Sequence, residues 1–183
     1  MKKRNPFSSY VGARFEQPEV DLDSRDIALL RELSRDSRQS QRALSRKVGM
    51  SPPAVAERLA RFERTGVVKQ YSVAIDWERL GLGVVAIVNL TLRPAQDRQA
   101  VVDALTAMVE LEQLTVVTGR YDLTARFRIA DQGHLRELIL DRIPELPGIL
   151  RTETLLGLGT VDTDDFACRI FDTLPADGES VAV

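Results

Sequence analysis

Apolar residues recur every three to four positions in the first third of the chain, which is the spacing of a helix with one buried face. Ile27, Leu30 and Leu33 form the first such stripe. Asp23 has the short polar side chain of an N-cap, and Asp26, three residues later, completes a variant of the capping box. The pattern therefore predicts a helix that begins directly after Asp23.

The stretch SQRALSRKVGMSPPAVAERLARFERTG, residues 40–66, predicts two further helices joined by a tight turn. Serine is a favoured N-cap, glycine is a favoured helix stop, and proline is tolerated in a first helical turn. The residues in these roles are the N-caps Ser40 and Ser51, the stops Gly49 and Gly66, and the first-turn prolines Pro52 and Pro53. A short helix, a glycine-containing turn and a second helix are typical of a DNA-binding helix-turn-helix.

The N-terminal part of the second helix in such a motif enters the major groove of DNA. Arg58 and Arg61 lie off the apolar stripe of this helix, so we expect them to read guanine or to bind phosphates. The alternative is an exposed pairing with Glu57 or Glu63. The candidate DNA-binding residues are Ser40, Gln41, Arg42, Arg46, Lys47, Ser51, Pro52, Pro53, Ala54, Glu57, Arg58 and Arg61.

The hydrophobic pattern changes after the third helix. Residues 67–76 alternate enough to predict a strand, which either pairs with a neighbouring chain or leads into a linker. The stretch DWERLGLG, residues 76–83, has the turn residues and glycines of a hinge. The elements predicted beyond it are a strand over 84–92, a helix over 97–108, strands over 113–118 and 123–129, a helix over 131–143 and a strand over 149–158.

This βαββαβ order predicts a ferredoxin-like module, an antiparallel sheet with both helices on one face. The fold class is therefore α/β of the α+β type, with a helix-turn-helix domain in front. The other sheet face needs a cover, and a second copy of the chain is the natural one. The expected division is a flexible arm over 1–21, a helix-turn-helix domain over 22–75, a hinge over 76–83, a ferredoxin-like domain over 84–172 and a disordered tail over 173–183.

The length and the amino-acid composition narrow the class of protein. A chain of 183 residues with 44% hydrophobic and 28% charged residues is ordinary for a soluble globular protein, and no apolar run reaches the length that spans a bilayer. Cys168 is the only cysteine, which excludes an internal disulfide and fits the cytoplasm. With His134 as the only histidine, a zinc site is improbable, and we expect neither a metal nor a cofactor.

The net charge of −2 conceals an uneven distribution. Residues 23–70 carry 11 Lys or Arg and 6 Asp or Glu, a net charge of +5, whereas residues 71–183 carry 10 and 18, a net charge of −8. Clustered positive charge neutralises phosphates, so the predicted helix-turn-helix is the basic part of an otherwise acidic protein.

Four segments in order resemble the Lrp/AsnC, or feast/famine, family of transcriptional regulators. They are LDSRDIALLREL, SQRALSRKVGMSPPAVAERLARFERTGVVKQY, VVTGRYDLTARFRIAD and LPGILRTETLLGLG, and the resemblance covers residues 22–159. It implies a regulator that binds double-stranded DNA as a homodimer or a larger homo-oligomer and responds to a small molecule, usually an amino acid. It implies no membrane association.

The same resemblance implies where the effector binds, between dimers near a Gly-x-x-Asp turn. By position, the effector-binding residues are Gly119, Tyr121 and Asp122, with Thr152 and Thr154 on the last strand. Asp122 offers an anion for the ammonium group of an amino acid, and the turn and the threonines offer donors for its carboxylate. The alternative is that Gly119 only serves the turn and that Asp122 only caps it.

Two competing functions remain open at this point. One is an architectural protein that bends DNA without an effector. The other is an enzyme similar to the siroheme decarboxylases, which share the two-domain layout and use acid and base groups, typically histidine. The lone His134 lies within a predicted helix, and no nucleophile–base pair, phosphate loop or metal spacing occurs. We therefore expect no enzymatic activity.

Overall fold

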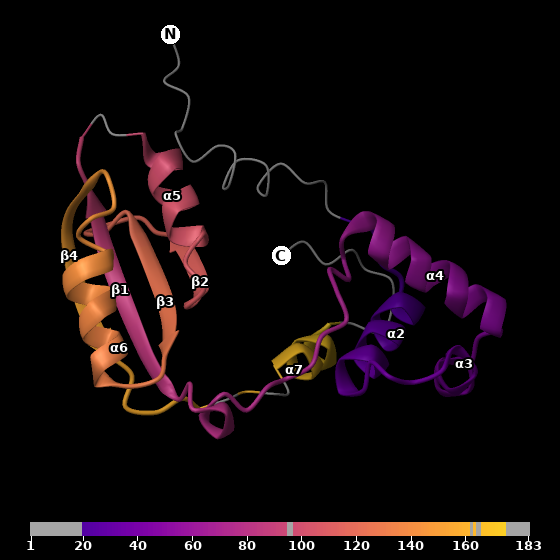
Figure 1. The fold of residues 1–183 in the computed structure, drawn as a ribbon. Coiled ribbons are helices and arrows are strands. Elements are labelled where there is room, and N and C mark those ends of the chain that lie inside the picture. Colours follow the sequence, from indigo (N-terminus) through magenta and orange to yellow (C-terminus); the bar gives the residue numbers. More distant parts are fainter. Residues whose placement is uncertain (1–19, 95–96, 162, 164–165, 175–183) are drawn as a thin grey trace, which may run out of the picture. The chain divides into compact units, whose positions relative to one another are not determined.

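A computed structural model describes residues 20–94, 97–161, 163 and 166–174 (Figure 1). These residues form two compact units, and each is described by itself. One unit contains residues 20–74 together with those from 161 onward, and the other contains residues 75–160. The predicted N-terminal arm and the predicted tail lie outside the described residues, except for residues 20–21 and 173–174.

The first unit consists of helices, and its first three helices begin where the capping residues predict. The helices are α2 (Ser24–Arg35), α3 (Gln41–Val48), α4 (Pro52–Thr65) and α7 (Phe166–Thr173). Asp23, Ser40 and Ser51 are the N-caps of α2, α3 and α4, and Gly49 and Gly66 end α3 and α4 in the left-handed conformation. The predicted helix-turn-helix is confirmed.

A small apolar core holds this unit together. Its buried members come from α2, α3 and α4, and they are Leu29, Leu30, Leu33, Leu44, Val55 and Phe62. Partly buried apolar side chains surround them, among them Leu59, Val67, Val68 and Phe171. Phe171 belongs to α7, so the C-terminal helix completes the core of the helical unit.

Residues 67–76 form no strand, which corrects the prediction for this segment. A strand requires a hydrogen-bonded neighbour, and none of the described residues pairs with this segment. Val67 and Val68 pack against the helical core, whereas the apolar side chains beyond them lie largely in solvent, since Tyr71 is 48% and Val73 is 74% exposed. Within the predicted hinge, the short helix η2 (Glu78–Leu80) ends at Gly81 in the left-handed conformation.

The second unit is a four-stranded antiparallel sheet with the predicted βαββαβ order. Its elements are β1 (Val84–Leu92), α5 (Arg98–Thr106), β2 (Leu111–Val116), β3 (Leu123–Ile129), α6 (Gln132–Arg136), η3 (Glu137–Arg142) and β4 (Ile149–Leu156). The strand order is β2-β3-β1-β4, and β1 pairs with both β3 and β4. The ferredoxin-like arrangement is therefore confirmed.

One face of this sheet carries the core. Alternate residues of β1 and β3 are buried, and the same cluster contains Val101 and Leu105 of α5, Leu138 of η3 and Ile143 directly after η3. Most of the side chains that alternate with them are less buried. Ile87 and Arg126, which lie opposite each other, are half-buried, and Leu155 is 48% exposed. The helices thus cover one face, whereas the described residues cover the other only in part, at Val85, which is buried, and at Arg128, which Trp77 contacts.

The strand β2 begins and ends two residues earlier than the predicted 113–118, and two helical segments also differ from the prediction. The predicted helix over 131–143 consists of a short α-helix, α6, followed by the π-helical η3. In addition, α7 belongs to the helical unit rather than to the sheet domain predicted over 84–172. The reason is that Phe171 packs into the helical core and that Arg31 of α2 pairs with Asp172 of α7.

Candidate functional site

The N-terminal end of α4 is open to solvent. Ser51, Pro52, Pro53 and Glu57 are exposed, and Ala54 is half-buried. The Ser51 hydroxyl accepts the Ala54 N–H at 3.4 Å, and no acidic residue lies in the first turn. The positive end of the helix dipole is therefore available for an anion, and DNA phosphates are anions of this kind.

The helix α3 presents three exposed cations beside this end of the motif. Ser40 and Gln41 at its start are exposed as well. Lys47 is engaged, because its Nζ lies 2.6 Å from a carboxylate oxygen of Glu32, and this contact lowers the pKa of Glu32. Within the described part of the chain, Arg42 and Arg46 form no ion pair. These two arginines are thus the predicted cations whose charge is not neutralised locally.

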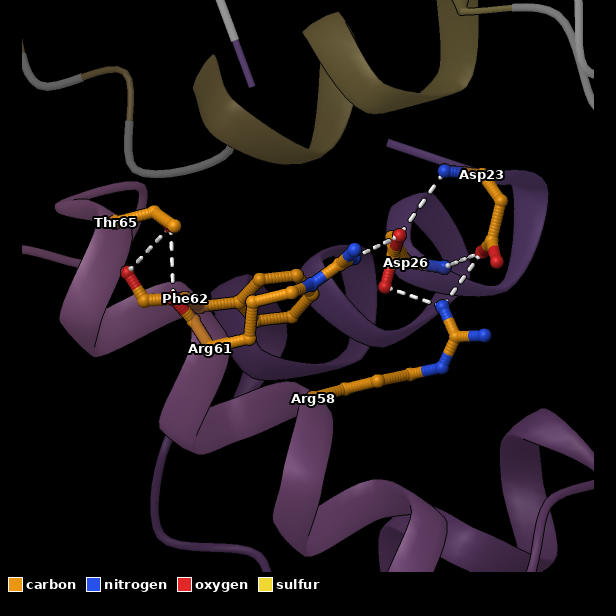
Figure 2. Close-up of polar contacts among 6 residues, drawn as sticks. All are labelled: Asp23, Asp26, Arg58, Arg61, Phe62 and Thr65. Atoms are coloured by element: carbon orange, nitrogen blue, oxygen red, sulfur yellow. Dashed lines mark hydrogen bonds and ion pairs between the residues drawn. The ribbon is translucent and has the colours of Figure 1, made fainter. Parts of the chain in front are cut away.

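Arg58 and Arg61 point toward α2 and pair with carboxylates there, an arrangement that the sequence did not predict (Figure 2). Arg58 Nη1 lies 2.5 Å from Asp26 Oδ1 and 2.8 Å from Asp23 Oδ1. Arg61 Nη2 pairs with the other oxygen of the Asp26 carboxylate. Nor do the two arginines pair with Glu57 or Glu63, the neighbours that the alternative interpretation named. We call Asp23, Asp26, Arg58 and Arg61 the Asp26 clamp.

Asp26 is the centre of this clamp. Its side chain is 1% exposed, and both halves of the predicted capping box form, with Asp23 and Asp26 each accepting the other's backbone N–H. A buried carboxylate needs cationic partners, and the sequence supplies two arginines at the spacing of one helical turn in α4. The hydrogen bond from Arg58 lowers the pKa of Asp23 to about 2. The clamp therefore fixes α4 against α2.

The predicted effector turn lies between β2 and β3. Gly119 is exposed and has a φ of 117°, a conformation that favours glycine. Asp122 accepts the Leu92 N–H at 2.9 Å, and Arg98 of α5 lies 3.4 Å from its other oxygen. Its carboxylate thus ties the turn to the end of β1 and to the start of α5.

Tyr121 turns in a different direction. Its hydroxyl donates to Glu153 of β4, and this hydrogen bond raises the pKa of Tyr121. Glu153 is not among the predicted effector residues. It lies between Thr152 and Thr154 in the predicted strand, so the strand pattern places it on the opposite face of the sheet from the two threonines. No other signal in the sequence marks its position. Thr152 and Thr154 pair with Leu90 and Val88, and both threonines are half-buried. The described contacts do not join the five predicted effector residues into one cluster.

A second buried carboxylate lies at the junction of α5 and β2. Glu110 is 8% exposed at its side chain, and its Oε1 contacts Arg142 and lies 3.1 Å from His134 Nε2. Burial raises the pKa of Glu110, but Arg142, a backbone N–H and His134 outweigh this effect and lower the pKa to about 2. His134 Nδ1 also lies 3.4 Å from the Ala130 backbone nitrogen, so both ring nitrogens face groups of the sheet unit. The only histidine therefore supports the fold.

No described helix is long and apolar enough to cross a membrane. No three or more His, Cys, Asp or Glu side chains in the described ranges are grouped so as to hold a metal ion.

Comparison with known proteins assigns each unit to a class. Residues 22–69 match a family described as winged helix-turn-helix DNA-binding, and residues 85–165 match the Lrp/AsnC ligand binding domain. These two matches, on units with the geometry described above, define a DNA-binding transcriptional regulator with a ligand-binding domain.

The relatives agree with this class. The leucine-responsive regulatory protein of Escherichia coli is 32% identical over 148 residues, which cover 80% of this chain and 90% of that protein. A transcriptional regulator of Neisseria meningitidis, solved as a complex with L-Met, has a TM-score of 0.73 at 25% identity and covers 77% of this chain and 92% of its own. The leucine response regulatory protein LrpA of Mycobacterium tuberculosis has a TM-score of 0.69 at 33% identity, with 78% and 97% covered. The chain belongs to the Lrp/AsnC family.

Proposed function

We propose that this regulator binds specific sites on double-stranded DNA as a homodimer or larger homo-oligomer and that an amino acid controls its binding. The observation that carries the proposal is the combination of the two units in one chain. One presents a capped recognition helix with an open N-terminal end, and the other matches the family's ligand-binding domain. The cytoplasm is the compartment where such a protein meets both DNA and free amino acids.

The DNA contacts in this proposal come from two groups of residues. Ser51, Pro52, Pro53, Ala54 and Glu57 at the open end of α4 face the base edges, because this end of the motif enters the major groove. Ser40, Gln41, Arg42, Arg46 and Lys47 of α3 contact the phosphates on either side. We remove Arg58 and Arg61 from the contact set, since their guanidinium groups are held by Asp23 and Asp26.

The partly covered sheet face supports self-association. The alternating residues of β1, β3 and β4 on this face include Ile87 and Leu155, which the described chain leaves open. A second copy that packs on this face places two α4 helices in one assembly. Two recognition helices read two half-sites, which gives a short helix enough contacts for specific binding.

An amino acid is the proposed class of effector. The support is that relatives are named as leucine-responsive and that one structural neighbour was solved with L-Met. The turn at Gly119, Tyr121 and Asp122, with Thr152 and Thr154, stays the proposed site, completed by residues of a second dimer. In this arrangement the Asp122 carboxylate keeps its contacts with the Leu92 N–H and with Arg98. The same carboxylate also binds the ammonium group of the effector.

A thermal shift experiment on the full chain tests the effector. We expect one amino acid or a few related ones to raise the Tm, since a ligand at 100 times its Kd stabilises a fold by about 2.7 kcal/mol. Asp122→Ala and Asp122→Asn should remove the shift, while Asp141→Ala, which changes an exposed acid of η3, should keep it. An undiminished shift in the Asp122 variants would move the ligand elsewhere, and no shift with any amino acid would refute the effector class.

The family assignment weighs against the two competing functions. An architectural protein without an effector has no use for a ligand-binding domain, and residues 85–165 match one. A siroheme decarboxylase needs acid and base groups at a pocket, whereas His134 is engaged with Glu110 and Ala130. We therefore propose a regulator without enzymatic activity.

A further inference from the structure

The helix α7 lies outside both family matches, which end at residues 69 and 165. It nevertheless belongs to the helical unit, where it packs beside α2. The chain therefore connects the sheet domain to the DNA-binding unit twice, once through the residues before β1 and once through the residues after β4. The second connection starts at the strand that carries Thr152 and Thr154.

The described contacts of α7 with the helical unit include one apolar contact and two polar contacts with Arg31. Phe171 packs against the apolar core of the helical unit. Arg31 Nη2 donates to the Phe171 carbonyl at 2.5 Å, and its Nε lies 2.9 Å from Asp172 Oδ1. Arg31 thus brings a cation to the C-terminal end of α7, where carbonyl groups lack partners and the helix dipole is negative.

These contacts are weak enough to open. A helix of 8 residues is not stable by itself in water, so α7 is helical because it is docked. Only part of its apolar surface is covered, since Phe166 is 60% and Ile170 is 44% exposed. The ion pair with Asp172 is open to solvent, and such pairs contribute little.

The position of α7 gives it influence over DNA binding. Its contact residue Arg31 is on α2, and α2 also carries Asp26, which holds α4 through Arg58 and Arg61. We propose that α7 is a releasable latch that ties the DNA-binding unit to strand β4, and that its release weakens binding to DNA with two half-sites. This inference rests on the proposed function, because it requires a dimer that reads two half-sites. When one of the two connections is lost, each unit moves more freely. Binding to two half-sites then costs more conformational entropy.

The first test concerns the latch without DNA. Phe171→Ala removes the docked aromatic ring, and Phe166→Ala is the matched control on the exposed side of the same helix. Hydrogen exchange of the full chain should show about tenfold lower protection of the α7 amides in Phe171→Ala and no change in Phe166→Ala. Cys168, the only thiol, should react several-fold faster with a thiol reagent in Phe171→Ala. Equal exchange and equal labelling in both variants would overturn the latch.

The second test concerns DNA. A duplex with two half-sites is first selected from random sequences with the wild-type protein. Its affinity is then compared with that of a duplex of equal length that keeps only one half-site. Phe171→Ala should lose about tenfold in affinity for the first duplex and about twofold or less for the second. Arg31→Ala should lose affinity in the same pattern but by a smaller factor, because its ion pair is open to solvent. Arg25→Ala, which changes an exposed arginine of α2, is its control.

Each outcome of the DNA test assigns a role. An equal loss on both duplexes would overturn the proposal and make α7 a support of the fold alone. No loss on either would show that α7 does not act on binding, which also overturns it. Wild-type protein without sequence preference would refute the proposed function and this consequence together, while the exchange data would still show whether α7 opens.

Discussion

Asp26 is a fully buried carboxylate, and its surroundings determine how the arginines of α4 are used. Taking a carboxylate out of water costs several kcal/mol unless charges and hydrogen bonds compensate. Arg58, Arg61 and the backbone N–H of Asp23 supply this compensation. The two arginines thus support the fold of the helical unit, whereas Arg42 and Arg46 of α3 form no ion pair within the described residues.

Removal of both partners of Asp26 should destabilise the helical unit. We expect Arg58→Ala/Arg61→Ala to lower the free energy of unfolding by about 3 kcal/mol, because it leaves a buried charge without a partner. Arg64→Ala, which changes an exposed arginine of the same helix, should stay within about 0.5 kcal/mol of wild type. Urea unfolding followed by circular dichroism measures both. A double variant as stable as Arg64→Ala would contradict the clamp.

The dependence of DNA binding on salt should separate phosphate contacts from the clamp. Arg42→Ala and Arg46→Ala should each reduce the slope of log K against log [salt] by about 1, since each loses one phosphate contact. Arg58→Ala should leave the slope unchanged, because its charge neutralises carboxylates. Fluorescence anisotropy over a salt series measures the slopes. A reduced slope in Arg58→Ala would return this arginine to the DNA interface.

Glu110 predicts a pH dependence for the sheet domain. Its pKa is about 2 in the folded state, below the ordinary value of 4.5. The unfolded chain therefore binds the proton more readily, so the stabilisation is present above pH 4.5 and is lost as the pH falls toward 2. Glu110→Gln should be less stable near neutral pH and should lose less stability on acidification than wild type.

Trp77, the only tryptophan, belongs to the sheet unit and reports its unfolding. Urea titrations at pH about 6 and about 3 give the two free energies for each protein. Glu145→Gln, which changes an exposed acid of the same domain, should keep the wild-type pH dependence. If Glu110→Gln also kept the wild-type pH dependence, Glu110 would not be the group that causes the loss of stability at low pH.

At the scale of the elements, the turn between α3 and α4 depends on one glycine. Gly49 has a φ of 65°, and a Cβ at this position would meet nothing within 4 Å. Gly49→Ala should therefore cost only backbone strain, about 1–2 kcal/mol in the free energy of unfolding. Gly49→Asn should cost less, because asparagine tolerates the left-handed conformation better. An alanine variant as stable as wild type would contradict this role.

Local signals in the sequence predicted the elements whose stability is local. The polar N-caps at Asp23, Ser40 and Ser51 and the stop at Gly49 predicted four helix ends, because each acts within one helical turn. The strands β1 and β3 match their predicted bounds of 84–92 and 123–129, because continuous or alternating apolar runs pack in a buried sheet.

Features that depend on distant partners were missed. The segment 67–76 alternates like a strand but has no described neighbour to pair with. Arg58 and Arg61 look free on a helical wheel, and only the fold brings them to Asp26, more than 30 positions earlier in the chain. The segment of α7 was expected to belong to the sheet domain, because its packing depends on Arg31 and on the core of the helical unit, which lie far away in the sequence.

At the scale of the whole molecule, the two units differ in charge, and the chain connects them twice. The basic stretch over residues 23–70 lies in the helical unit, and the acidic remainder includes the sheet domain. The chain passes from the sheet domain to the helical unit at both of the domain's ends. A change at β4 therefore has a direct covalent route to the unit that binds DNA.

Sequence-specific DNA binding is the central claim, and one affinity ratio tests it most directly. The full chain is titrated by fluorescence anisotropy, at fixed physiological salt, against a duplex selected from random sequences and against a scrambled duplex of equal length and composition. We predict that the selected duplex binds at least about 1,000 times more tightly, which is the lower range for specific regulators. A ratio near one would contradict the account.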